Sequence, residues 1–78
     1  MQQYNPHHHP VVLRLPQVKE RVGLSRATIY LRMQDGTFPG QINLGGRAVG
    51  WLESDIDEWL EAQIQQSRAA QAHKKNSK

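Results

Sequence analysis

Apolar residues in the first third of the chain recur at helical spacing and stop at a glycine. Val18 and Val22 lie four residues apart and therefore share one face of a predicted helix over 16–22. Pro16 suits the first turn of this helix, where its missing N–H leaves no hydrogen bond unmade. Gly23 ends the helix, because glycine readily adopts the left-handed conformation that follows a last helical turn.

A second predicted helix begins only a few residues later. Ser25 is a suitable N-cap, since its hydroxyl can accept a hydrogen bond from the N–H of Ala27 or Thr28. The helix runs over 26–35, and Gly36 ends it. The segment "GLS" that joins the two helices is a short, glycine-containing turn, which is typical of a helix-turn-helix.

The second half of the chain predicts a β-hairpin and a third helix. The runs 41–44 and 47–52 have the composition of strands and flank Gly45–Gly46, which we expect at the turn. Ser54 caps the third helix, which has acidic residues in its first turn and ends near residue 66. One apolar stripe of this helix contains Ile56, Trp59, Leu60 and Ile64.

The positions that meet beneath the turn of a helix-turn-helix must be apolar. Here these positions are Val18, Val22, Leu24 and Ile29. The hairpin that follows carries Arg47 at or next to its tip, as the wing of a winged domain would. The predicted fold class is therefore mainly α with a small β-hairpin, a winged helix-turn-helix of three helices and a wing.

A length of 78 residues leaves room for one domain. We expect a disordered arm over 1–11, the winged helix-turn-helix domain over 12–66, and a basic, frayed tail over 67–78. The adjacent histidines His7 to His9 predict no metal site, because neighbouring side chains diverge in extended chain and no second cluster completes a coordination sphere. No cofactor is expected, and the chain has no cysteine for a disulfide or a thiolate ligand.

The net charge of +3 is unevenly distributed. Residues 14–47 contain six basic and two acidic side chains, residues 53–61 contain five acids and no base, and the tail from Arg68 contains four bases and no acid. This distribution favours a polyanion as partner of the first half, with the acidic segment facing away from it. Ordinary solvated faces would explain the charge alone almost as well.

If Ile29 faces the core, three residues at the start of the second helix, at positions 25–27, and Tyr30 one turn later point outward. Arg26 can then pair with the O6 and N7 atoms of guanine or reach a phosphate. The hydroxyls of Thr28 and Tyr30 suit phosphate oxygens, and Ala27 can touch a thymine methyl group. The alternatives are a solvated arginine at position 26 and a half-buried, amphipathic ring at position 30.

Arg47 adds a second candidate contact. An arginine at the tip of a narrow, otherwise uncharged hairpin can enter a minor groove, whereas the simpler alternative is an exposed turn arginine that keeps the hairpin soluble. The residues expected to contact DNA are Ser25, Arg26, Ala27, Thr28, Tyr30, Gln34 and Arg47.

The segment from Leu13 to Ile64 resembles the AlpA family of small, often prophage-encoded transcriptional regulators. The resemblance lies in "GLSRATIY", "GTFP", "GGRAVGW" and the spacing of "WLESDIDEW". It implies a winged helix-turn-helix related to MerR-type regulators and phage excisionases, and control of a nearby promoter, in some members that of an integrase or excision gene. Gly40–Gln41 depart from the family, in which a basic residue or proline is frequent there, and this removes one phosphate contact.

The predicted function is a monomeric, sequence-specific transcriptional regulator whose partner is double-stranded DNA. An excisionase-like factor that bends DNA during recombination is the alternative, followed by a protein-interaction module that uses the stripe of the third helix. An enzyme is not expected, because no nucleophile, base and orienting group are spaced to converge. We expect a cytoplasmic protein, nucleoid-associated when bound to DNA and without a membrane partner. Cooperative self-association on DNA and contact with RNA polymerase or a recombinase stay open.

Overall fold

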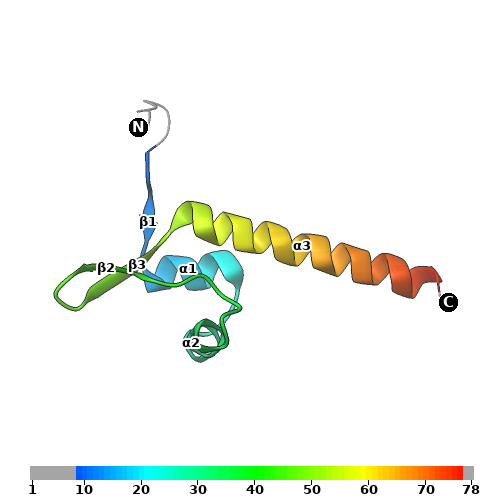
Figure 1. Cartoon of the computed structure of the whole chain (residues 1–78), viewed down its shortest axis with the longest axis horizontal. Coiled ribbons are helices and arrows are strands. Elements are labelled where there is room, and N and C mark those ends of the chain that lie inside the picture. Colours follow the sequence, from blue (N-terminus) through cyan, green and yellow to red (C-terminus); the bar gives the residue numbers. More distant parts are fainter. Residues whose placement is uncertain (1–8, 77–78) are drawn as a thin grey trace.

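The computed structural model describes residues 9–76, with side chains for residues 9–71. Its elements in chain order are β1 (Val12–Leu13), α1 (Leu15–Val22), α2 (Arg26–Asp35), β2 (Ile42–Gly45), β3 (Ala48–Leu52) and α3 (Glu53–Asn76). Figure 1 shows α1 beneath α3, α2 seen end-on below α1, and the β2–β3 hairpin projecting to one side. This arrangement confirms the predicted winged helix-turn-helix with three helices and a hairpin wing.

The ends of α1 and α2 follow from local sequence signals. Gly23 and Gly36 follow the two helices with φ angles of 70° and 79°, the left-handed conformation that glycine adopts without strain. Ser25 caps α2, since its Oγ accepts a hydrogen bond from the Thr28 N–H at 3.2 Å. At the start of α1, the side chain of Gln17 accepts a hydrogen bond from the Arg14 N–H at 2.8 Å. The predicted helix-turn-helix boundaries are therefore confirmed to within one residue.

A three-stranded antiparallel sheet of order β1-β3-β2 joins the helices. The short strand β1 is one that the sequence pattern does not predict. It pairs Val12 with Leu52 and Leu13 with Trp51, and the Glu53 N–H donates to the Val11 carbonyl at 2.8 Å. The chain thus enters the domain beside the junction of β3 and α3.

The turn of the hairpin lies one residue later than predicted. Gly46 and Arg47 form the turn, and Gly45 ends β2 opposite Ala48. The cause is a register shift between Asn43 and Gly45, which inserts one extra residue into β2. Arg47 consequently occupies the turn itself.

The core gathers residues from every element except β2, together with Phe38 from the segment between α2 and β2. Its buried members are Leu13, Val18, Ile29, Phe38, Trp51 and Ile56, and Val22, Leu24 and Met33 are among the partly buried residues packed against them. The four apolar positions expected beneath the turn therefore all pack on the core. Two indoles tie the segment between α2 and β2 to this core, since Trp51 Nε1–H donates to the Pro39 carbonyl at 3.2 Å and Trp59 Nε1–H to the Thr37 carbonyl at 2.7 Å.

The third helix differs from the prediction at both ends. It begins at Glu53, directly after β3, so Ser54 lies inside the first turn instead of capping it. It continues to Asn76 instead of ending near residue 66, in keeping with the high helix propensity of the Ala, Gln, Arg and Lys residues there. Ile64 departs from the expected core stripe, because it is 40% exposed.

The predicted arm over 1–11 lies largely outside the described residues, and fraying of the tail over 67–78 stays a prediction. Among the helices of the described part of the chain, none has the length and apolar character needed to cross a bilayer.

Candidate nucleic-acid interface

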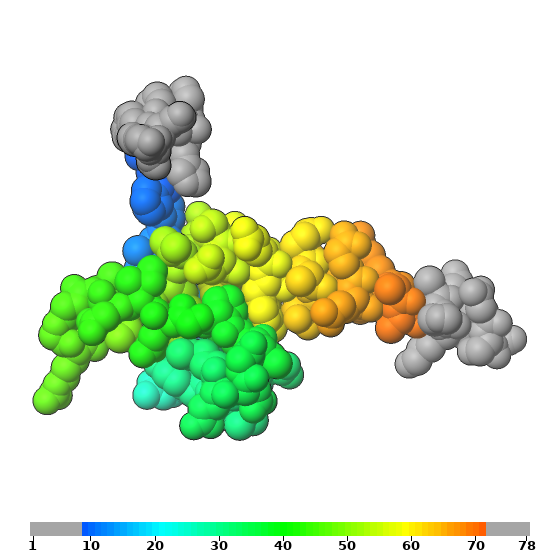
Figure 2. Space-filling model, viewed as in Figure 1, coloured from blue at the N-terminus to red at the C-terminus, as the bar shows by residue number. Residues whose placement is uncertain are grey.

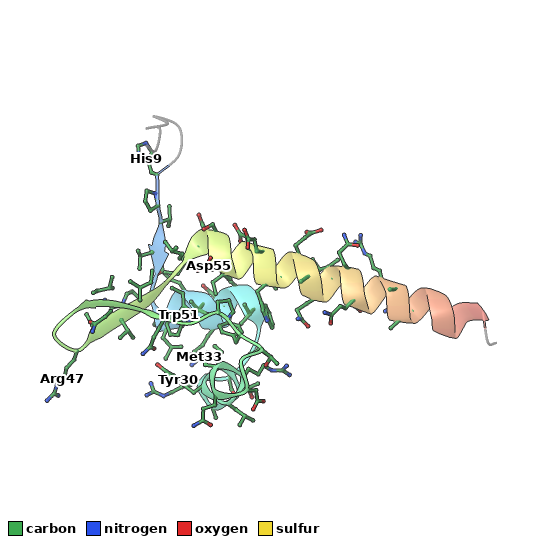
Figure 3. All side chains as sticks on the ribbon, viewed as in Figure 1. His9, Tyr30, Met33, Arg47, Trp51 and Asp55 are labelled. Carbon is green, nitrogen blue, oxygen red and sulfur yellow. The ribbon has the colours of Figure 1, made fainter. Side chains whose placement is uncertain are left out.

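The predicted DNA-contacting residues lie on α2, on its cap and on the hairpin. Arg26, Ala27 and Gln34 are exposed on α2, and Thr28 and Tyr30 are half-buried. Figure 2 shows α2 and the hairpin projecting on the same side of the molecule, with the surface curving inward between them. In Figure 3, Arg47 and Tyr30 lie on this side. The fold thus brings the two predicted contact regions to one side.

The hydroxyl groups at the start of α2 bond to each other. Ser25 Oγ donates to Thr28 Oγ1 at 3.0 Å while it accepts the Thr28 N–H. The Ser25 proton is therefore used within the protein, and the Thr28 hydroxyl keeps its own proton to donate. A phosphate oxygen beside this turn would be bound by Thr28 more directly than by Ser25.

The Arg26 guanidinium lies over the Tyr30 ring, and this ring is both half-buried and in contact with an exposed side chain. The Arg26 Cζ atom lies 5.2 Å from the centre of the Tyr30 ring, at the distance of a cation–π contact. The ring itself lies edge-on to the buried Trp51, with centroids 6.4 Å apart and planes at 70°. A cation–π contact uses the positive charge of a guanidinium and none of its N–H groups as hydrogen-bond donors, so these can still form a fork of two hydrogen bonds. Tyr30 is therefore half-buried and still part of the outward-facing surface.

Leu31 is an outward-facing residue that sequence reasoning missed. It is 57% exposed and borders a shallow depression with Ala27, Tyr30, Met33, Gln34 and Gln41. The sequence could have indicated this exposure, because Leu31 lies four residues after Ala27 and on the face of α2 opposite the buried Ile29. An exposed leucine there offers an apolar surface beside the polar Gln34.

Two of the basic residues counted in the first half have structural roles. Arg21 Nη2 donates to Glu53 Oε2 at 2.6 Å, and Arg21 Nη1 lies 3.5 Å from Asp57 Oδ1. The hydrogen bond to Glu53 raises the pKa of Arg21 above its ordinary value, against the partial desolvation of the guanidinium. Arg14 Nε donates to the Val49 carbonyl at 2.8 Å, which ties the start of α1 to β3.

The basic surface is therefore narrower than the residue count indicated. Among the described residues, ion pairs involve only Arg21 with Glu53 and Asp57. The basic side chains outside these structural contacts in residues 14–47 are Lys19, Arg26, Arg32 and Arg47. Arg26 and Arg47 are the two that lie on the predicted interface.

Residues 9–76 bring together no group of three or more His, Asp or Glu side chains that could hold a metal ion. His7 and His8 of the histidine run lie outside the described residues.

Comparisons with known proteins agree with the geometry. The profile of the family described as prophage CP4-57 regulatory protein (AlpA) matches residues 11–64. The DNA-binding transcriptional activator AlpA of Escherichia coli K12 is 47% identical over an alignment of 55 residues, which covers 63% of this chain and 79% of the activator. Protein ORF88 of Enterobacteria phage P4 is 46% identical over 52 residues, or 67% of this chain, but the chain spans only 59% of that protein. The match extends from β1 through the helix-turn-helix and wing into α3, and the chain therefore belongs to the AlpA family.

Proposed function

We propose that this protein is a small, sequence-specific DNA-binding regulator of transcription. The observation that carries the proposal is the guanidinium of Arg26, stacked on Tyr30 at the outer surface of α2 on the side to which the hairpin and Arg47 project. The name of the Escherichia coli relative, a DNA-binding transcriptional activator, supports the same function. Catalysis is not part of this proposal.

In the proposed complex α2 lies in the major groove. The edge of Arg26 faces the O6 and N7 atoms of a guanine, and Ala27, Leu31 and Gln34 face the neighbouring base edges. Thr28 donates to a phosphate and fixes the register of the helix on the duplex. Arg47 reaches the backbone or the minor groove beside this site.

A salt titration of DNA binding tests this docking. On a site selected by the protein from a random DNA pool, Arg26→Ala should weaken binding by roughly 1–3 kcal/mol and relax the preference at one base position. Arg47→Ala should flatten the plot of log affinity against log salt by about 0.9 for each phosphate that the protein no longer neutralises. Fluorescence anisotropy at several salt concentrations measures both quantities.

Arg32→Ala is the matched control, because it removes the same charge from the same helix. Arg32 borders the groove between α2 and α3, together with Asp55, Glu58 and Trp59, and so lies on the other flank of α2 from Arg26. Its removal should leave the base preference unchanged. If Arg26→Ala and Arg47→Ala also leave affinity and slope unchanged, the proposed docking is wrong.

The shape of the bound DNA separates a regulator from an architectural factor. For the regulator we expect little bending, because two compact contact regions can follow the surface of straight B-form DNA. The mobility of complexes with circularly permuted fragments measures the bend. Strong bending together with no effect on transcription from the adjacent promoter would identify the excisionase-like role instead.

A further inference from the structure

The third helix continues far beyond the core that it helps to form. Gln63 is its last half-buried residue, and every residue from Ile64 to Gln71 is exposed, while the backbone stays helical to Asn76. The part of the helix beyond Gln63 measures about 20 Å at 1.5 Å per residue. Figure 1 shows it projecting away from the other elements. Isolated helices of this length are marginally stable in water, so a surface that packs along this part would stabilise it.

The charges along α3 reverse sign at its middle. The five acidic residues lie within 53–61, and the basic residues Arg68, Lys74 and Lys75 all follow Ile64. The helix dipole favours this order, but its effect is confined to the first and last turns. Glu61 lies eight residues after the start of α3 and Arg68 eight residues before its end. The helix dipole therefore does not explain why an acid stands at position 61 or a base at position 68.

Glu61, Ile64 and Arg68 share one exposed face of the helix, at spacings of three and four residues. Ile64 is an exposed large apolar side chain, and the two charges flank it. Gln65 Nε2 donates to one carboxylate oxygen of Glu61, Oε2, at 3.0 Å, and the described residues give the other oxygen, Oε1, no hydrogen bond. The order along the helix axis on this face is thus acid, apolar, base.

We infer that this face pairs with the same face of a second copy of the chain, with the two α3 helices antiparallel and centred on Ile64. In that arrangement Glu61 of each copy lies beside Arg68 of the other, and the two Ile64 side chains meet. The interface is self-complementary, as a two-fold axis requires. A parallel arrangement would instead place acids beside acids and bases beside bases.

The pairs between Glu61 and Arg68 are the ones that decide the orientation. Glu53 and Asp57, the other acids on this side of α3, already have Arg21 as their partner within the same chain. Two exposed ion pairs and one apolar contact make a weak dimer in free solution. Two copies bound to neighbouring DNA sites would be held at a high effective concentration and would pair more fully. The expectation of a monomer then applies to dilute solution only.

Charge reversal tests the pairing without any DNA. Sedimentation equilibrium of the full chain at low salt, over a wide range of protein concentration, should show reversible dimers that weaken when salt screens the charges. Glu61→Arg alone and Arg68→Glu alone should each raise the dissociation constant about tenfold, because both ion pairs become repulsive. An equimolar mixture of these two variants should dimerise again, since one copy then carries two bases at these positions, the other carries two acids, and both facing pairs join opposite charges.

Gln66→Arg is the control, because it adds a positive charge to the same part of α3 at an exposed position about 140° around the helix axis from Glu61. It should leave the dissociation constant close to that of the unmodified chain. The inference is overturned if the unmodified chain stays monomeric at millimolar concentration and low salt, if Gln66→Arg acts like Glu61→Arg, or if the mixture of variants fails to recover. None of these outcomes depends on DNA binding, so a failure of the inference would not contradict the proposed function.

Discussion

The Trp51→Ala variant should lose about 3–5 kcal/mol of unfolding free energy, the range typical of removing a fully buried aromatic side chain. Trp51 is 0% exposed and is among the largest fully buried side chains of the described residues. It pairs with Leu13 across the sheet, lies edge-on to Tyr30 and donates its indole N–H to the Pro39 carbonyl. Small domains are stable by about 5–15 kcal/mol, so this loss removes a large share of the unfolding free energy and, at the lower end of that range, leaves part of the protein unfolded.

Urea denaturation followed by far-ultraviolet circular dichroism measures the effect, and Trp59 remains as an independent fluorescent probe. Trp51→Phe is the control, since it keeps an aromatic ring in the same site and loses only part of the volume and the hydrogen bond to Pro39. The unfolding free energy of this variant should lie between those of the alanine variant and the unmodified chain. A loss below about 1 kcal/mol for Trp51→Ala would mean that the core does not depend on this ring.

The Gly50→Ala variant should be destabilised by about 1–3 kcal/mol through overpacking of the sheet. A Cβ atom at Gly50 would lie 2.5 Å from Val12 Cγ1 and 2.9 Å from the Leu13 carbonyl oxygen. The valine side chain can turn away, but the carbonyl belongs to the backbone of β1, which is paired with β3. The methyl group should therefore push β1 away from the sheet.

Thermal unfolding measures the loss, and amide hydrogen exchange of the Glu53 N–H, which donates to the Val11 carbonyl, reports the separation of β1 directly. Gly40→Ala is the control, because the added Cβ would meet nothing within 4 Å and its backbone lies outside the left-handed region. The double variant Val12→Ala/Gly50→Ala should recover part of the loss. Equal stability of Gly50→Ala and Gly40→Ala would contradict the close approach of β1 to β3.

Local signals explain why the helix-turn-helix could be predicted closely, whereas β1 and the position of the hairpin turn could not. The ends of α1 and α2 depend on single residues with strong conformational preferences, Gly23, Ser25 and Gly36. The two-residue strand β1 has no such signal, because it forms only when Leu13 meets Trp51 across 38 positions of chain. The hairpin turn was misplaced by one residue because a bulge depends on the register of both strands, and neither strand shows that register alone.

The candidate site also has features that the sequence could predict and features that it could not. Helical periodicity places Arg26, Ala27 and Gln34 on the surface, and the structure agrees. Periodicity does not reveal that Arg26 stacks on Tyr30, because that contact depends on side-chain rotamers. It also does not reveal that Arg21 is paired with Glu53, since the two residues meet only when α1 packs beside the start of α3.

The indole hydrogen bonds to the Thr37 and Pro39 carbonyls have a consequence for DNA recognition. The segment that carries these carbonyls is the only covalent path from α2 to the hairpin, and it is held at Thr37 by the half-buried Trp59 and at Pro39 by the buried Trp51. The distance between the proposed helix contact and the proposed wing contact is therefore determined by the protein without DNA. A duplex whose grooves are too wide or too narrow for that separation would have to deform, so Trp51 and Trp59, which need touch no nucleotide, would contribute to the choice of binding site.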